Sequence, residues 1–210
     1  MIWIKGPLMD VEKKMEPLAI FRGLSAEKLK SLAERTLYRS FKAGETTIGE
    51  ADPARAFYVV IEGQVKLSKI SAEGKEQTLN LLGPGEPFGM CTAFAVDSFP
   101  ATAVSIGESA VLLIPGPVME AIAMKEPQLL VNIIQILSRR LKESMALVES
   151  LSLKEMPQRI ASFLIHALKD RKGQDADELA LTFSHRELAK ILGATPEALS
   201  RTLRKMSQAG

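Results

Sequence analysis

Residues 182–206, TFSHRELAKILGATPEALSRTLRKM, contain two helix-start signals separated by a glycine. Ser184 and Glu187 fit the capping box S-x-x-E, in which each side chain satisfies a backbone N–H of the other residue. Thr195, followed by a proline, fits an N-cap with proline at the first helical position. Gly193 can take the positive φ that ends the first helix. The stretch therefore predicts a helix, a tight turn and a second helix.

The second predicted helix separates apolar from polar side chains. Its apolar stripe, at i, i+4 and i+7, consists of Leu199, Leu203 and Met206. Its polar face consists of Glu197, Ser200, Arg201 and Arg204. A carboxylate can accept a hydrogen bond from cytosine N4, and a guanidinium can donate two to guanine O6 and N7. The pattern predicts a helix-turn-helix whose second helix enters the major groove of DNA.

An ordinary helical hairpin with a solvated charged face is the alternative. Basic residues favour DNA, because a positive patch on a nearly neutral chain is expected for phosphate contact. The basic residues that outnumber Glu187 and Glu197 here are Arg186, Lys190, Arg201, Arg204 and Lys205. The predicted phosphate contacts are Ser184, His185, Thr195, Arg204 and Lys205.

The composition excludes several classes of protein. The chain has 210 residues, a net charge of +2 and one cysteine, Cys91, which can form neither an internal disulfide nor a four-thiolate iron–sulfur cluster. No apolar run approaches the roughly 20 residues that span a bilayer, and no signal peptide is evident. The motifs G-x-S-x-G, H-E-x-x-H and the P-loop are absent, so the chain is not expected to be an enzyme. We expect a cytoplasmic protein without a membrane partner.

Short apolar runs divided by glycine turns extend from Tyr38 to Ile114. The runs at 57–61 and 64–68 flank Glu62-Gly63, which predicts a hairpin. Further strands are predicted around 78–82, 101–106 and 110–114, and Pro115-Gly116-Pro117 is predicted to end the domain. Regularly spaced short strands favour a closed antiparallel domain, which we predict to be a small jelly-roll barrel. Residues 1–15 are predicted to be a poorly ordered arm.

A long helical segment follows, from residue 128 to about residue 153. Its apolar residues, spaced four and three apart, are Leu130, Ile134, Leu137, Leu141, Met145 and Val148. They form the seam of a predicted homodimeric coiled coil, although packing inside the same chain is the alternative. A twofold protein suits a palindromic DNA site. The predicted divisions are a barrel at 15–125, a dimerisation helix at 126–153 and a DNA-binding domain at 154–210, which together make an α+β fold.

This order of parts, with FKAGETTIGEADPARAFYVVIEGQVKLSKISAEGKEQTL at residues 41–79, resembles the CRP/FNR superfamily of bacterial transcription regulators. The resemblance implies a cyclic-nucleotide-binding-like barrel that holds an effector, and a winged helix-turn-helix that binds DNA. Glu197-Ala198-Leu199-Ser200-Arg201 resembles the E-x-x-S-R recognition helix of the FNR type. The resemblance implies palindromic DNA with TTGA-like half-sites, read by Glu197, Ser200 and Arg201, and RNA polymerase as a partner of an activator. The family would continue past residue 210 into a β-hairpin wing, so the wing is expected to be missing.

The chain departs from the family at its effector site. Ala51 stands where the family usually has a turn glycine, and Met90 stands where a ribose-binding glutamate would lie. Residues 99–102 lack the arginine and serine that would hold a cyclic phosphate. A buried phosphate without a cationic partner binds poorly, so we expect no response to cAMP. The expected effector pocket consists of Phe88, Gly89, Met90, Cys91, Pro100, Ala101 and Thr102.

Ser152-Leu153-Lys154 and the barrel hairpins are similar to the DNR/HcpR subgroup, which implies haem and the sensing of nitric oxide or nitrosative stress. Both histidines, His166 and His185, lie outside the barrel, so methionines are the candidate haem ligands, with Met90 and Met145 foremost. The competing functional hypothesis is a ligand-binding or redox-sensing module whose C-terminal helices contact a protein.

Overall fold

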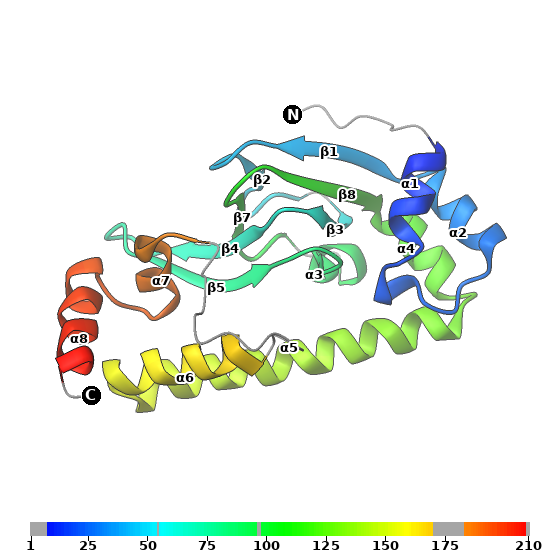
Figure 1. Cartoon of the computed structure of the whole chain (residues 1–210). Coiled ribbons are helices and arrows are strands. Elements are labelled where there is room, and N and C mark those ends of the chain that lie inside the picture. Colours follow the sequence, from blue (N-terminus) through cyan, green and yellow to red (C-terminus); the bar gives the residue numbers. More distant parts are fainter. Residues whose placement is uncertain (1–7, 54, 96–97, 170–182, 209–210) are drawn as a thin grey trace. The chain divides into compact units, whose positions relative to one another are not determined.

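The structure is a computed structural model that describes residues 8–53, 55–95, 98–169 and 183–208 (Figure 1). Contacts divide the chain into two compact units. Unit 1 holds the chain up to Lys69 together with Asn80–Leu141, and unit 2 holds Ile70–Leu79 together with the chain from Lys142 onward. None of the described helices is long and apolar enough to cross a membrane.

The described strands lie in two four-stranded antiparallel sheets, ordered β1-β8-β3-β6 and β2-β7-β4-β5. The strands are β1 (Leu37–Phe41), β2 (Thr46–Ile48), β3 (Ala56–Glu62), β4 (Val65–Ile70), β5 (Glu76–Leu82), β6 (Pro87–Phe88), β7 (Thr102–Ser105) and β8 (Ser109–Pro115). Aromatic and β-branched residues dominate β3, which is buried from Ala56 to Val60 and lies between β8 and β6. This arrangement confirms the predicted antiparallel barrel.

The predicted hairpin around Gly63 is wrong in its pairing. β3 pairs with β8 and β6, whereas β4 belongs to the other sheet, so Glu62-Gly63 is a corner between sheets. Gly63 has φ +73°, and a Cβ there would lie 2.2 Å from the Glu108 carbonyl oxygen. Ser109 Oγ donates to the Gln64 carbonyl at 3.1 Å and holds the two corners together. The local pattern of apolar residues predicts where the strands lie, but which strands pair depends on this contact between distant residues.

Helices of unit 1 cover one end of the barrel (Figure 1). They are α1 (Leu8–Met15), η1 (Ala19–Phe21), α2 (Ala26–Ala33), α3 (Met90–Phe94) and α4 (Gly116–Ala123). The predicted N-terminal arm is wrong for residues 8–15, because Val11 and Met15 are buried in a core shared with β3, β8 and α4. Pro117 stands in the first turn of α4, so it begins a helix at the predicted domain end.

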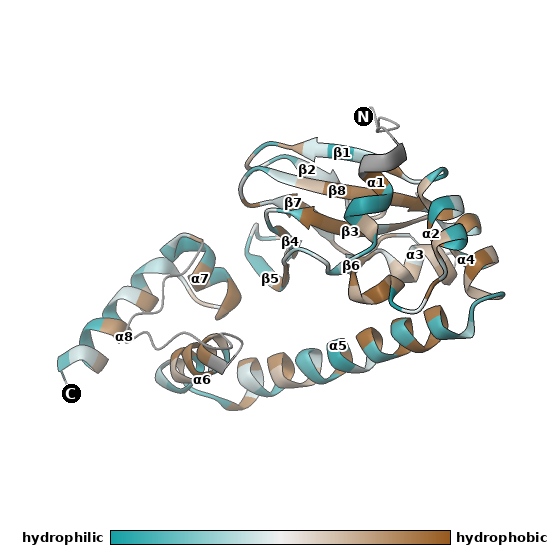
Figure 2. Cartoon of the chain, turned by 45° about the vertical axis from the view of Figure 1, so that its right-hand side comes forward, coloured by the Kyte–Doolittle hydropathy of each residue, from teal (hydrophilic) through white to brown (hydrophobic). Residues whose placement is uncertain are grey.

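The long helix α5 (Pro127–Leu153) agrees with the predicted segment. Its first turns bury Leu129, Asn132 and Ile133. Asn132 Nδ2 donates to the carbonyls of Ile20 and Arg22, each at 2.9 Å, and fixes the helix to the η1 segment. Figure 2 shows hydrophobic residues recurring along α5. The predicted seam residues are 38–64% exposed.

Unit 2 contains the remaining described helices, α6 (Met156–Lys169), α7 (His185–Ile191) and α8 (Pro196–Gln208). Their common core contains Ile160, Leu188, Ala189, Leu192 and Leu199. Arg159 donates to three backbone carbonyls, those of Leu151, Lys154 and Leu192, at 2.9, 2.9 and 3.2 Å. These carbonyls belong to helix ends that lack intrahelical donors, so the guanidinium joins α5, α6 and α7.

Candidate nucleic-acid interface

Ser184 and Thr195 cap the two helices, as the sequence predicts. Ser184 Oγ accepts from the Glu187 N–H at 3.2 Å, and Thr195 Oγ1 accepts from the Ala198 N–H at 3.2 Å. Gly193 between the helices has φ +67°, and a Cβ there would lie 2.7 Å from the side chain of Leu151. The turn therefore needs glycine for both its conformation and its packing.

Lys190 differs from its predicted role in the basic cluster. Its ammonium contacts Glu76 at 2.6 Å and Glu187 at 2.9 Å, all within unit 2. Burial lowers the pKa of Lys190, but the hydrogen bonds to Glu76 and Glu187 outweigh it and raise the pKa above its ordinary value. Because the pKa is raised, the charged Lys190 stabilises the folded state in full at neutral pH. This stabilisation is lost only when strong alkali removes the proton. Lys190 thus joins α7 to Glu76, the first residue of β5.

The residues predicted to read bases lie on the exposed face of α8. Glu197, Ser200 and Arg201 are exposed, whereas Leu199 is fully buried. Hydrogen bonds from the Glu197 backbone N–H and from Thr195 lower the pKa of the Glu197 carboxyl, and the charges of Arg201 and Arg186 act in the same direction. Glu197 is therefore ionised at neutral pH and can only accept hydrogen bonds.

The predicted phosphate contacts lie at the starts of α7 and α8 and farther along α8. Ser184 and His185 lie exposed at the start of α7, and Thr195 lies exposed at the start of α8. Arg204 and Lys205 are exposed one turn beyond Arg201. Helices α7 and α8 pack through the unit 2 core, so both groups lie on one helix pair. Backbone N–H groups at the helix starts and the cations of α8 suit the anionic phosphate backbone of DNA.

The predicted effector pocket lies among buried residues of the barrel. Phe88 stacks on Tyr58 with ring centroids 4.9 Å apart, and Phe99 meets Phe88 edge-on at 6.3 Å. Burial and the charge of Asp52 raise the pKa of the Tyr58 hydroxyl to about 12, so it is neutral at physiological pH. Aromatic side chains thus fill this part of the barrel core.

The remaining pocket candidates are dispersed around these rings. Gly89 has φ +77°, and a Cβ there would lie 2.7 Å from Tyr58. Ala101 is buried, Cys91 is half-buried and Pro100 is exposed. Thr102 is half-buried, with its Oγ1 3.4 Å from the Glu50 N–H donor. Only some of the candidates therefore lie in the barrel interior.

The two foremost haem-ligand candidates have different environments. Met90 is 8% exposed and belongs to the apolar core that contains Phe57 and Met119. Met145 is 64% exposed on α5. A porphyrin at Met90 would have to displace the packed side chains, so the arrangement does not fit haem there. Within the described part of the chain, no three histidine, cysteine, aspartate or glutamate side chains are grouped to hold a metal.

Sequence reasoning missed Arg159 and Asn132, which position the helices of the two units. Their partners are backbone carbonyls up to 112 residues away along the chain. An arginine near a helix start and an asparagine inside a helix are common on surfaces, and no periodic signal separates these two from such residues.

Two protein families match the chain in the order that the fold shows. Residues 38–126 match the cyclic nucleotide-binding domain family, and residues 158–210 match the Crp-like helix-turn-helix domain family. The chain belongs to the CRP/FNR family of transcription regulators. It is a DNA-binding regulator of that type and not an enzyme.

Relatives within the CRP/FNR family align along most of the chain. The Cyclic AMP receptor protein of Thermus thermophilus is 29% identical over 93% of this chain and 88% of its own length. The Transcriptional activator protein anr of Pseudomonas aeruginosa is 27% identical over 93% of this chain and 81% of its own. The solved structure of FixK2 from Bradyrhizobium japonicum is 27% identical, with a TM-score of 0.72 over 83% of this chain and 86% of that one. Of these three names only that of the Thermus thermophilus protein states a signal, cyclic AMP, and that signal is a property of the relative.

Proposed function

We propose that the protein reads palindromic double-stranded DNA with TTGA-like half-sites, using Glu197, Ser200 and Arg201 as base contacts. The observation that supports this proposal is that α8 has a buried apolar stripe on one side and an exposed polar face on another. An ionised Glu197 accepts from cytosine N4, and Arg201 donates to guanine O6 and N7. Phosphate contacts from Ser184, His185, Thr195, Arg204 and Lys205 hold the register.

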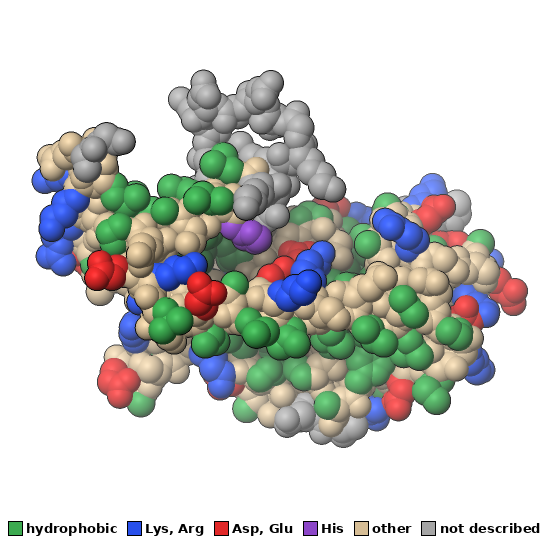
Figure 3. Space-filling view, turned by 90° about the horizontal axis from the view of Figure 1, so that it is seen from below, with side chains coloured by type: hydrophobic (Ala, Val, Ile, Leu, Met, Phe, Trp, Pro, Cys, Tyr) green, Lys and Arg blue, Asp and Glu red, His purple; other side chains and the backbone are tan. Residues whose placement is uncertain are grey.

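A homodimer joined along α5 would present two such faces. The seam residues Leu130 to Val148 are exposed in the single chain, and Figure 3 shows hydrophobic side chains gathered along α5. Burying this stripe against a second copy removes apolar surface from water and places the two readers under twofold symmetry. The proposal includes cytoplasmic action and contact with RNA polymerase as an activator.

We propose further that cAMP is not the effector. Phe99, Pro100 and Ala101 supply no cation or side-chain donor for a cyclic phosphate, and Phe99 is packed against Phe88. Isothermal titration with cAMP should give no binding heat. Saturable binding would overturn this part of the proposal.

Haem-based sensing of nitric oxide or nitrosative stress stays a prediction that rests on the resemblance in sequence. The packing of Met90 gives it no support. The absorption spectrum of protein purified from a haem-replete host tests it directly. A Soret band that disappears in Met90→Ala would favour haem, and a spectrum without a Soret band would remove it.

The DNA proposal is tested by measuring how two protein variants bind the preferred duplex, duplexes with one base changed in the half-site, and random duplexes. Arg201→Ala should cost about 1–3 kcal/mol on the preferred duplex and relax one base position. Lys205→Ala should instead weaken all duplexes alike and reduce the salt slope by about one. Equal losses from both variants on specific and random DNA would contradict the assigned roles. Binding that does not depend on salt would favour the alternative, a module whose C-terminal helices contact a protein.

A further inference from the structure

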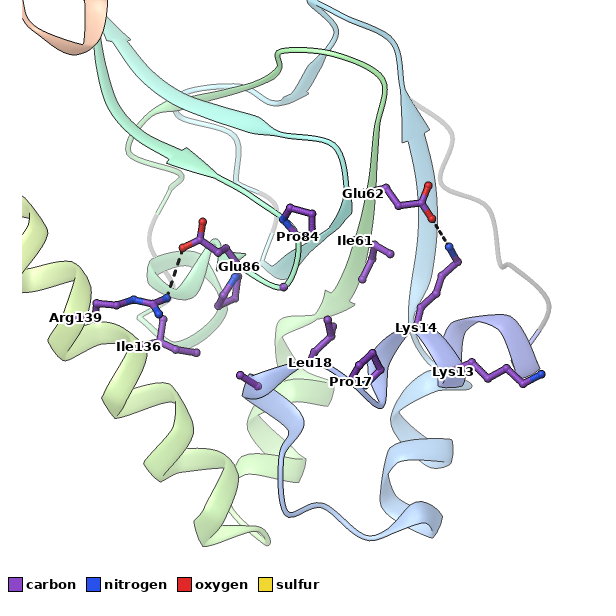
Figure 4. Close-up of a pocket in the computed structure, with 13 residues that line it drawn as sticks. Lys13, Lys14, Pro17, Leu18, Ile61, Glu62, Pro84, Glu86, Ile136 and Arg139 are labelled. Atoms are coloured by element: carbon purple, nitrogen blue, oxygen red, sulfur yellow. Dashed lines mark hydrogen bonds and ion pairs between the residues drawn. The ribbon is translucent and has the colours of Figure 1, made fainter. Parts of the chain in front are cut away.

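Unit 1 contains a cavity of about 660 Å³ outside the expected effector pocket. It lies where the N-terminal segment, the end of β3, the β5–β6 turn and α5 meet (Figure 4). The volume is in the range of sites for small organic ligands.

Much of the cavity lining is apolar. Leu18 and Ile61 lie on one side, and Ile136 faces them from α5 (Figure 4). Pro17, Pro84 and Pro87 add side chains that carry no hydrogen-bonding groups. All three aliphatic residues are only partly buried and pack against the unit 1 core. A hydrocarbon group in the cavity would cover them further and gain free energy by leaving water.

The charged side chains lie on two sides of the apolar part of the lining (Figure 4). Lys14 Nζ contacts Glu62 Oε1 at 2.5 Å, and Arg139 lies 3.5 Å from Glu86 Oε1. With Lys13, the lining carries three cations against two carboxylates, so it favours an anion.

Arg139 is the cation best placed to receive a ligand. Its side chain is 56% exposed and forms an ion pair with Glu86 at 3.5 Å. Glu86 Oε2 accepts from the Gly83 N–H at 2.8 Å, so the Gly83–Glu86 turn keeps this support if Arg139 turns toward another carboxylate. The planar guanidinium has five donors and can serve two carboxylates together.

We propose that this cavity binds a small amphipathic carboxylate, with its hydrocarbon body between Leu18, Ile61 and Ile136 and its carboxylate on Arg139. The site is distinct from the cyclic-nucleotide position, and the inference does not depend on the proposed DNA sequence. Its occupant would bridge the N-terminal segment and α5.

Octanoate, octan-1-ol and octylammonium serve as probes of equal chain length, measured by calorimetry and amide chemical shifts on the full chain without DNA. Octanoate should bind about tenfold more tightly than octan-1-ol and shift the amides of Leu18, Ile61 and Ile136. Octylammonium should bind more weakly than octan-1-ol. Arg139→Gln should remove the preference for octanoate, whereas the matched variant Lys142→Gln on the same helix should keep it.

Three results would overturn the proposal. The first is that octanoate and octan-1-ol bind with equal affinity, or that neither binds. The second is that Arg139→Gln still prefers octanoate to octan-1-ol. The third is that only the amides of Met145 and Val148 shift. The last would mean that the probe covers the exposed stripe of α5 instead of the cavity. The amide spectrum of Arg139→Gln without ligand shows directly whether that variant is folded.

Discussion

Helices α5 and α8 both carry apolar residues at spacings of three and four, but the two stripes have different surroundings. On α8, Leu199 is fully buried, and Leu203 and Met206 pack against the same core. On α5, Ile134 and Leu141 are 60% and 63% exposed. The same periodicity thus describes one stripe that the chain covers and one that it leaves uncovered.

A second face of α5 makes the contrast sharper. Leu129, Asn132 and Ile133 are buried against unit 1, so α5 already has one face packed inside the chain. A helix with a second apolar face needs a partner beyond that packing. We attribute the second face to the proposed dimer.

The largest effect is expected when the uncovered stripe is charged. Ile134→Glu places two carboxylates in the proposed dimer seam, one from each copy, and should weaken association by about 4 kcal/mol. Analytical ultracentrifugation should show monomers, while far-UV circular dichroism stays unchanged because Ile134 is exposed in the single chain. Gln135→Glu adds the same charge on the same helix outside the seam and should remain dimeric. If Ile134→Glu also remains dimeric, the seam is misassigned.

A smaller loss is expected from the covered stripe. Leu199→Ala opens a cavity in the unit 2 core and should lower the free energy of unfolding by about 3 kcal/mol. Urea denaturation followed by circular dichroism measures this change. Ser207→Ala, at an exposed position of the same helix, should stay within about 0.5 kcal/mol of the parent. Equal midpoints for the two variants would show that the α8 stripe is not a core.

The packed face of α5 gives an intermediate test within one helix. Asn132→Ala leaves the Ile20 and Arg22 carbonyls without their donor and should cost about 2 kcal/mol of unfolding free energy. Gln135→Ala, at an exposed position, should be close to neutral. Dimerisation should survive both changes. Loss of the dimer in Asn132→Ala alone would mean that the two faces of α5 are coupled.

The smallest effect is expected at Ala51, which belongs to neither stripe. A substitution there measures the cost of backbone strain in the barrel. Ala51 has φ +63°, a conformation that disfavours a side chain, so Ala51→Gly should stabilise unit 1 by about 0.5–1 kcal/mol. Thermal unfolding should show the rise. Ala72→Gly, at an exposed turn position without positive φ, should show a small decrease. A decrease in both variants would exclude strain at Ala51.

Local chemistry accounts for the parts of the molecule that were predictable. The caps at Ser184 and Thr195, the positive φ of Gly193 and the division of α8 into faces depend on residues three or four positions apart. The short apolar runs likewise predicted β3, β4, β5, β7 and β8, whereas β1, β2 and β6 were not predicted. The glycine position occupied by Ala51 was recognised from the family resemblance, and its positive φ agrees with that.

Contacts between distant residues account for what was not predictable. The pairing of β3 with β8 depends on a corner held by Gln64 and Ser109, and a strand carries no mark of the sheet that it will join. Asn132 and Arg159 bind backbone carbonyls from other segments, which sequence periodicity does not encode.

The amino-acid pattern was sufficient for the helix-turn-helix, the division of α8 into apolar and polar faces and the long amphipathic helix, because each follows from side chains within one or two turns. Folding in three dimensions was needed to separate the buried stripe of α8 from the exposed stripe of α5, to place aromatic rings inside the barrel and to form the cavity beside Arg139. These features arise where segments remote in the chain compete to cover the same surface, and the outcome depends on the packing of all of them together.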